Sequence, residues 1–303
     1  MSKIITVFGA TGNQGGSVIK QLLNDSKLSQ EFKIRGVTRD SSKPAAQELA
    51  KLGVEVVVAD LSSKESLQAA LQGSHTVFLV TNYWETANPA IELSQGKNVA
   101  DVSKEVGVQH LIFSSLLNVT ETSGGRLTHV PHFDGKSDIE QYIRDLGVPA
   151  TFYLPGYFMS NLEQMIRPGQ DGALTWALPI AENSKFPLID IKSDTGKFVK
   201  AIIKNRSSVL GARVLGAENY YTATQVLDTL AKVTGKKTGF VRLDEGTYKS
   251  FLPEFMAQEM LENHLFIENP GYYGGEDLEK SHAILDEKLV SLEEFLEKSS
   301  FKA

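Results

Sequence analysis

Three glycines recur at intervals of three residues near the start of the chain, at positions 9, 12 and 15. They follow an apolar run at residues 4–8 and precede an amphipathic stretch, a pattern typical of strand, turn and helix. Such glycines allow a sharp turn and the close approach of a phosphate and a helix, whose first N–H groups face the anion. A plain turn is the alternative, since the spacing differs from Gly-x-Gly-x-x-Gly. The predicted pyrophosphate-binding turn comprises Gly9, Thr11, Gly12, Asn13, Gln14 and Gly15.

The loop after the second predicted strand carries Arg39 and Asp40. In a dinucleotide-binding fold this loop meets the adenosine ribose. An arginine there pairs with a 2′-phosphate and selects NADP(H), whereas an acidic residue accepts a hydrogen bond from a free 2′-hydroxyl and selects NAD(H). We favour NADP(H) bound by Arg39. The alternative is an exposed Arg39 beside an Asp40 that binds NAD(H).

Polar residues also follow the third and fourth predicted strands. Asp60 is placed to accept a hydrogen bond from the adenine amino group, with Leu61 against the ring. The alternative for Asp60 is an N-cap of the next helix. Asn82 and the backbone beside it, including Thr81, are expected to line the diphosphate and the nicotinamide ribose.

Candidate catalytic residues follow the fifth predicted strand. Short-chain dehydrogenases use a serine to polarise the substrate carbonyl, a tyrosine to donate a proton, and a lysine four residues after that tyrosine. Here Lys136 has His132 four residues before it, so the usual proton donor is replaced. His132 can donate a proton near neutral pH, although a plain loop histidine is the alternative. Lys136 and Tyr157 are the other candidate proton sources.

Taken together, these motifs resemble the NmrA-like family of atypical short-chain dehydrogenase/reductase proteins. The resemblance covers most of the chain and is strongest over residues 1–165. The motifs that carry it are Gly-Ala-Thr-Gly-Asn-Gln-Gly-Gly at 9–16, Val-Thr-Arg at 37–39, Val-Thr-Asn-Tyr-Trp-Glu at 80–85, Gln-Gly-Lys at 95–97, His-Phe-Asp-Gly-Lys at 132–136 and Pro-Gly-Tyr-Phe-Met-Ser-Asn at 155–161.

The resemblance implies a bound NADP(H) and a set of residues that contact it. Besides the glycine turn, that set comprises Arg39, Thr81, Asn82, Lys97, Lys136, Tyr157, Phe158 and Asn161. Studied members of the family are dinucleotide-responsive regulators that bind other proteins, and related reductases work with a lysine and no tyrosine. Two functions therefore stay open. One is a redox sensor with little or no turnover, favoured by the replaced proton donor; the alternative is an NADPH-dependent reductase of a quinone, enone or other small carbonyl compound.

The elements that must position these residues alternate regularly along the first half of the chain. Strands are expected at residues 3–8, 32–38, 54–59, 76–80, 110–114 and 150–154. Helices are expected at residues 15–24, 44–51, 64–71, 92–106 and 135–146. This order, with strands that are apolar nearly throughout, predicts an α/β fold with a doubly wound parallel sheet of the Rossmann type. Ligands in such sheets bind beyond the carboxyl ends of the strands.

The alternation weakens after residue 155. We expect a dinucleotide-binding domain at residues 1–155, which segments near 186–216 rejoin, and a smaller α+β domain at 156–303 for a substrate or partner. An apolar group recurs at helical spacing in the second domain. We interpret it as a core-facing stripe, with a lid or partner surface over the cleft as the alternative. Its members are Phe251, Phe255, Met256, Met260 and Leu261.

Composition excludes several classes of function. The 303 residues include no cysteine, which rules out disulfides and thiol chemistry. A net charge of −6 disfavours direct nucleic-acid binding, and no apolar run approaches the ~20 residues that span a membrane. His129 and His132 lack the further ligands of a metal site, so no metal is expected. The chain begins with a strand rather than a leader, and we expect a cytoplasmic protein with the nucleus as a second location.

Overall fold

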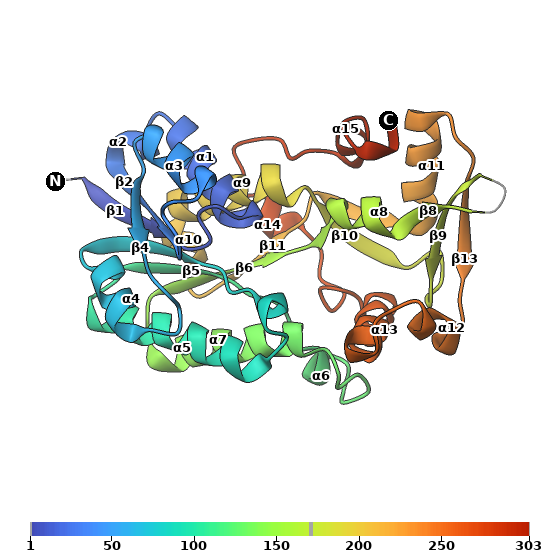
Figure 1. Cartoon of the computed structure of the whole chain (residues 1–303), viewed down its shortest axis with the longest axis horizontal. Helices are drawn as coiled ribbons and strands as arrows, with labels where there is room; N and C mark the ends of the chain where they lie inside the picture. Colours follow the sequence, from blue (N-terminus) through green and yellow to red (C-terminus); the bar gives the residue numbers. More distant parts are fainter. Residues whose placement is uncertain (1, 170–171, 303) are drawn as a thin grey trace.

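The computed structural model describes residues 2–169 and 172–302. Within these residues the main sheet has seven parallel strands in the order β11-β6-β5-β4-β1-β2-β3 (Figure 1). The strands β1 to β6 have the spatial order 3-2-1-4-5-6 of doubly wound dinucleotide-binding folds, which confirms the predicted fold class. The strands are β1 (Lys3–Val7), β2 (Phe32–Thr38), β3 (Glu55–Val58), β4 (Ser74–Leu79), β5 (His110–Ser114), β6 (Ala150–Pro155) and β11 (Arg213–Gly216).

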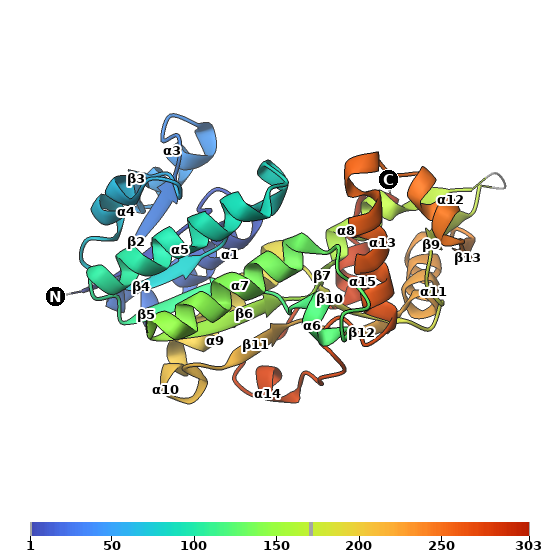
Figure 2. The same ribbon diagram turned by 90° about the horizontal axis from the view of Figure 1, so that it is seen from below.

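Helices cover both faces of this sheet (Figures 1 and 2). β5 and β6 are accordingly buried along their whole length, as central parallel strands must be. One face carries α1 (Asn13–Asn24) and α9 (Ile191–Lys204), and the other carries α4 (Lys64–Leu71), α5 (Pro89–Glu105) and α7 (Pro131–Leu146). Shorter helices in this half are α2 (Leu28–Glu31), α3 (Pro44–Lys51), η1 (Tyr83–Glu85), α6 (Val119–Thr122) and α10 (Arg206–Val209).

Close packing of α1 on α9 joins early and late parts of the chain. The backbone N–H of Gly196 in α9 donates to Ser17 Oγ in α1 at 2.9 Å. A Cβ atom at position 196 would lie 2.2 Å from the Ser17 carbonyl oxygen, so the helices could not approach this closely with a larger residue. Both α9 and β11 thus belong to the main sheet layer, although they follow residue 155.

The remaining chain builds two three-stranded sheets beside the main one (Figure 1). The first contains β7 (Tyr157–Phe158), β10 (Lys185–Ile189) and β12 (Asn219–Thr222); the second contains β8 (Ile166–Pro168), β9 (Leu174–Leu178) and β13 (Thr238–Arg242). The expected strand near residues 186–189 therefore pairs with β7 and β12 and not with the main sheet. The division into two domains at residue 155 stays a prediction.

Helices of the later chain pack around these small sheets. They are α8 (Met159–Met165), α11 (Ala223–Thr234), α12 (Glu245–Ser250), α13 (Glu254–Glu268), α15 (Leu292–Leu296) and η2 (Ser300–Lys302), whereas α14 (Glu279–His282) packs on β11 of the main sheet. Trp176 and Phe186, both fully buried, pack ring against ring between the two sheets, with 5.0 Å between centroids. Over the described ranges, none of the helices combines the length and apolarity needed to cross a membrane.

Candidate functional site

A cleft of about 1110 Å³ opens at the carboxyl ends of the parallel strands and extends to α12 and α13. The fold places a ligand at this edge of the sheet. The structure brings nearly all the predicted site residues together here. Those that line the cleft are Gly9, Thr11, Gly12, Asn13, Gln14, Gly15, Arg39, Asp60, Leu61, Thr81, Asn82, His132, Lys136, Tyr157, Phe158 and Asn161.

The glycine turn has the geometry that its spacing predicts. Gly9 adopts a φ of 61°, and its carbonyl accepts the N–H of Gly12 at 2.8 Å. A Cβ at Gly15 would lie 2.3 Å from the Gly9 carbonyl oxygen, so only glycine lets the helix start this close to the turn. Helix α1 begins at Asn13, and neither a capping side chain nor an acidic residue occupies its first turn. The turn can therefore accept a phosphate on its N–H groups.

Arg39 and Glu85 form an ion pair across the mouth of the cleft. Arg39 follows β2, whereas Glu85 ends η1 after β4, and both side chains are exposed to solvent. The neighbouring Asp40 carboxylate instead accepts hydrogen bonds from the N–H and hydroxyl of Ser42, at 2.9 and 2.6 Å, which lower its pKa. Arg39 and Asp40 both line the cleft, but the Asp40 carboxylate is hydrogen-bonded within its own loop while the Arg39 guanidinium pairs across to η1.

Asp60 lines the cleft but does not cap the following helix. Its Oδ1 accepts the N–H of Ser62 at 2.7 Å, while the N-cap of α4 is Ser63, whose hydroxyl accepts the N–H of Ser66. The helix-cap alternative for Asp60 is therefore wrong. Asp60 and Leu61 both line the cleft just beyond β3, in the region where a dinucleotide fold places adenine.

Lys136 is held by a glutamate that the sequence analysis missed. Its Nζ lies 2.5 Å from Oε1 of Glu92 in α5, and the same oxygen accepts the Thr81 hydroxyl at 2.6 Å. Glu92 is buried, and its Oε2 has no hydrogen-bond partner among the described residues. The ammonium group therefore compensates a buried carboxylate while it lies at the wall of the cleft.

His132 lies in the first turn of α7 and is not the loop histidine of the alternative interpretation. Its Nδ1 is 2.5 Å from Oε1 of Glu259 in α13, and its Nε2 is 3.2 Å from Nδ2 of Asn263. Tyr83 donates its hydroxyl to Oε2 of Glu259 at 3.2 Å. Trp84 packs on the imidazole, with ring centroids 5.1 Å apart. Burial lowers the pKa of His132, and Glu259 opposes that effect.

His129 makes a parallel contact one helical turn further along α13. Glu262 accepts both its backbone N–H and its Nδ1, each at 2.7 Å. The side chain of His129 is 63% exposed, compared with 13% for His132, and it does not line the cleft. Across the parts of the chain that the structure describes, no three His, Asp or Glu side chains gather in a way that could hold a metal ion.

Tyr157, a candidate proton source, and the serines at the end of β5 are each held by a neighbouring side chain. The Tyr157 hydroxyl donates to Sδ of Met165 at 2.7 Å, and burial raises its pKa, so it is a poor proton source. Ser115 is buried and donates to Glu140 at 2.7 Å. Ser114 lines the cleft and donates to Oε1 of Gln14 at 2.9 Å.

Lys97 is the predicted cofactor contact that lies outside the cleft lining. Its Nζ sits over the ring of Tyr142, 4.8 Å from the centroid, on the outer side of α5 and α7. Only the family resemblance predicts Lys97 as a cofactor contact. In the structure, the attraction of its ammonium group to the aromatic face of Tyr142 accounts for its position.

The far end of the cleft is apolar. Tyr248, Leu252, Met256, Met260 and Tyr272 line it, from α12, α13 and the segments beside them. The predicted core-facing stripe is therefore wrong in part. Leu261 is buried, but Phe251 and Phe255 are 70% and 73% exposed at the junction of α12 and α13.

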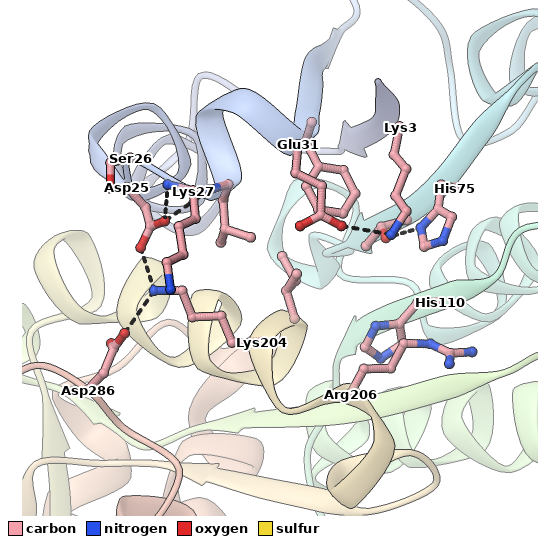
Figure 3. A pocket seen from close by; sticks show the side chains of 14 residues that line it. Lys3, Asp25, Ser26, Lys27, Glu31, His75, His110, Lys204, Arg206 and Asp286 are labelled. Atoms are coloured by element: carbon pink, nitrogen blue, oxygen red, sulfur yellow. Dashed lines mark hydrogen bonds and ion pairs between the residues drawn. The ribbon is translucent and has the colours of Figure 1, made fainter. Parts of the chain in front are cut away.

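A second hollow, of about 650 Å³, lies at the opposite edge of the sheet, where the strands begin (Figure 3). Its charged side chains largely pair with one another: Lys204 contacts Asp25 at 2.5 Å and Asp286 at 2.9 Å, and Lys3 contacts Glu31 at 2.7 Å. Doubly wound folds do not bind their ligands at this edge, so the cleft is the candidate site.

Solved structures share this architecture over nearly the whole chain. The crystal structure of NmrA, a negative transcriptional regulator, in complex with NADP superposes with a TM-score of 0.82 at 20% identity, covering 98% of this chain and 95% of that one. Triphenylmethane reductase from Citrobacter sp., complexed with NADP(H), superposes with a TM-score of 0.77 at 22% identity, covering 98% and 99%. These matches establish the fold.

Sequence relatives are closer. An NmrA-like family domain-containing oxidoreductase of Penicillium ochrochloron is 34% identical over 258 residues, which cover 78% of this chain and 75% of the relative. An NmrA-like family domain-containing protein of Dictyostelium discoideum is 33% identical and covers 100% of this chain and 99% of its own. A model of the NmrA-like family matches residues 1–296. The chain therefore belongs to the NmrA-like family.

Proposed function

We propose that the protein is an NADP(H)-dependent reductase of an apolar quinone, enone or other small carbonyl compound. The observation that carries the proposal is the continuity of the cleft. A phosphate-binding turn lies at one end, an apolar chamber at the other, and His132 and Lys136 lie along the same lining. Relatives named as oxidoreductases support the same reading.

The residues of the cleft fit a dinucleotide. The uncapped start of α1 suits the pyrophosphate, and a Cβ at Gly15 would abolish that cradle. Arg39 would pair with the 2′-phosphate and Lys136 would hold ribose hydroxyls. When bound, NADPH supplies the hydride, while the protein supplies orientation and the proton.

The apolar chamber would hold the substrate. Met256 and Met260 adapt to flat or irregular apolar molecules, and Tyr248 and Tyr272 offer ring faces. His132 is the proton source that the geometry favours, because the Tyr157 hydroxyl is turned to Met165 and Lys136 is bound to Glu92. The protonated imidazole would donate to the substrate oxygen as negative charge develops there.

The test is oxidation of NADPH by the purified protein against a panel of quinones, enones and aldehydes. We expect saturable, substrate-dependent turnover. His132→Gln should lower kcat about 100-fold, the lower end of the range for a lost general acid. His129→Gln is the matched control, since His129 has the same kind of glutamate partner outside the cleft, and it should leave kcat unchanged. Tight NADPH binding with no turnover on any compound would contradict the reductase.

A regulatory sensor that responds to NADP(H) is the second candidate, and the Arg39–Glu85 ion pair favours a response to the 2′-phosphate, which the oxidised and reduced cofactor share. A 2′-phosphate that captures Arg39 would release Glu85 at the end of η1. The preceding residues of η1, Tyr83 and Trp84, contact Glu259 and His132, so a shift of η1 would reach α13. Such coupling requires different contacts in the occupied and empty states.

Hydrogen exchange with NADPH, NADP⁺ and NADH tests this sensor. We expect NADPH and NADP⁺ to change the exchange of η1 and α13, and NADH, which lacks the 2′-phosphate, to change it less. If none of the three dinucleotides changes the hydrogen-exchange rates of α13, a structural change passed from Arg39 through η1 to α13 is excluded.

A further inference from the structure

We propose that Glu259 is the positioning residue for His132: it holds the Nδ1–H and thereby leaves Nε2 as the atom that exchanges a proton with a carbonyl or hydroxyl oxygen of the substrate. The inference rests on the proposed reductase for the identity of the substrate. The orientation and protonation of His132 can be measured without any substrate.

The contacts around Glu259 leave one arrangement of the imidazole protons. Oε1 of Glu259 receives the backbone N–H of His132 at 3.2 Å and faces its Nδ1 at 2.5 Å, while Oε2 accepts the Tyr83 hydroxyl at 3.2 Å. Glu259 is buried, and an ionised carboxylate only accepts hydrogen bonds. Nδ1 must therefore carry a hydrogen, and the neutral ring has its lone pair on Nε2.

Asn263 completes the assignment from the other side of the ring. Its amide Nδ2 lies 3.2 Å from Nε2, where an amide N–H donates to an unprotonated imidazole nitrogen. Asn263 and His132 both line the cleft. A substrate oxygen that accepts the Nε2 proton would take the place of the Asn263 amide beside the ring. The geometry points to substrates that present a carbonyl or hydroxyl oxygen there.

The proton balance of the reduction follows from this arrangement. The hydride would come from NADPH held in the cleft, so the part of this chain's residues is to supply the proton. The Nε2–H bond of the protonated His132 breaks as the O–H bond of the product forms. The imidazole returns to its neutral form, in which Nδ1–H still donates to the Glu259 carboxylate. A proton from solvent then restores the charged form before the next turnover.

The charges around the imidazole determine how the reaction depends on pH. Glu259 from α13 and Glu92 from α5 favour the protonated ring, while Lys136 from α7 and burial disfavour it. Because burial has the largest effect, the pKa of His132 lies below its usual value. The reduction rate should fall as pH rises through that pKa, and loss of the Glu259 charge should move the fall to lower pH.

The chain offers a matched control in Glu262. This residue lies one turn after Glu259 on α13 and contacts the backbone N–H and Nδ1 of His129 in the same manner. Since His129 does not line the cleft, Glu262→Gln removes a similar glutamate–histidine contact of α13 without touching the site. Any effect that Glu259→Gln shares with Glu262→Gln is structural.

Nitrogen-15 NMR of histidine-labelled, full-length protein without cofactor tests the inference, with His132→Gln used for assignment. In the wild type we expect neutral His132 to carry its proton on Nδ1. Glu259→Gln should lower the pKa of His132 by about one pH unit, as the loss of a neighbouring opposite charge does. Glu259→Leu should yield mixed tautomers, and Glu262→Gln should leave His132 unchanged.

A neutral wild-type ring protonated on Nε2, or an unchanged titration in Glu259→Gln, would overturn the inference. Neither result depends on Glu259→Leu folding, because Gln has the shape of Glu. In the NADPH assay, Glu259→Gln should lower kcat at pH 7 about tenfold, with KM within threefold, because a pKa lowered by one unit leaves tenfold less protonated ring. If the wild type turns over no compound, the proposed reductase fails while the NMR titration still decides the role of Glu259.

Discussion

We expect Arg39 to exchange its partner Glu85 for the 2′-phosphate when NADPH binds in the cleft. The guanidinium is bound to Glu85, but the pair is exposed, and exposed pairs contribute only about 0–1 kcal/mol. A phosphate that accepts two hydrogen bonds from the guanidinium is a stronger partner. On the proposed function, the ion pair would weaken NADPH binding slightly and would leave the expected preference for NADPH over NADH intact.

We expect Arg39→Ala to weaken NADPH binding at least tenfold, about 1.4 kcal/mol, with little effect on NADH. Glu85→Gln, which frees the guanidinium, should tighten NADPH binding by up to about fivefold, the equivalent of about 1 kcal/mol. Titration of intrinsic fluorescence with both dinucleotides measures these changes. Equal losses for NADPH and NADH in Arg39→Ala would remove Arg39 from the phosphate site.

Lys136 stabilises the fold by pairing with Glu92, in addition to its expected contact with the cofactor. Lys136→Met leaves the buried Glu92 carboxylate without its cation, and breaking a buried pair in this way costs about 3–5 kcal/mol. The double variant Lys136→Met with Glu92→Gln should regain most of that stability but not the NADPH affinity. Urea unfolding and NADPH titration separate the two effects. A double variant as unstable as the single one would show that the carboxylate charge is not the cause.

The glutamates of the site could not be predicted from local sequence. Glu92 precedes Lys136 by 44 residues, and Glu259 follows His132 by 127, so no spacing links either pair. In the sequence both glutamates have the pattern of ordinary surface residues of helices. Their role depends on the packing of α5 and α13 against α7, which the local sequence does not specify. The glycine turn, by contrast, was predictable because its geometry is set within seven consecutive residues, Gly9 to Gly15.

At the scale of elements, the start of α1 depends on how closely the helix approaches the turn before it. Gly15→Ala would place a methyl group 2.3 Å from a backbone oxygen and should cost about 1–3 kcal/mol and most of the dinucleotide affinity. Gly16→Ala is the control: its Cβ finds its nearest neighbour at 3.5 Å, so alanine should be tolerated or add a few tenths of a kcal/mol. Thermal unfolding and NADPH titration measure both. If Gly15→Ala and Gly16→Ala have the same stability and the same NADPH affinity, the close approach of α1 to the turn at Gly9 is not what requires glycine at position 15.

The central strands were predictable because burial on both faces makes each of them a continuous apolar run. The helices between them were predictable from apolar residues at helical spacing. The small sheets were harder. β7 has two residues, and β12 and β13 are only partly buried, so their sequences lack a clear period. Their pairing depends on partners far along the chain, such as β9 with β13. Local patterns cannot specify such contacts.

Across the whole molecule, the last segment of the chain ties the later part back to the main sheet layer. Asp286 contacts Lys200 of α9 at 2.7 Å and Lys204 at 2.9 Å. The N–H of Val290 donates to the buried Asp194 of the same helix at 3.0 Å. Lys204 also contacts Asp25, which follows α1. Charged residues from three segments that are distant in the sequence therefore meet on the face of the main sheet that α1 and α9 cover.

This charged cluster should make stability depend on pH through Asp25. The hydrogen bond from Lys204, aided by the N–H groups of Leu28 and Lys27, lowers the pKa of Asp25 from 3.8 to about 2. Its stabilising effect is complete above pH 3.8 and is lost as pH falls through about 2, because the unfolded chain takes up the proton first. Asp25→Asn should lower the free energy of unfolding at pH 7 by at most about 2 kcal/mol and flatten its slope between about pH 4 and 2. Urea titrations across this range measure the slope, and a variant with the wild-type slope would place the acid sensitivity elsewhere.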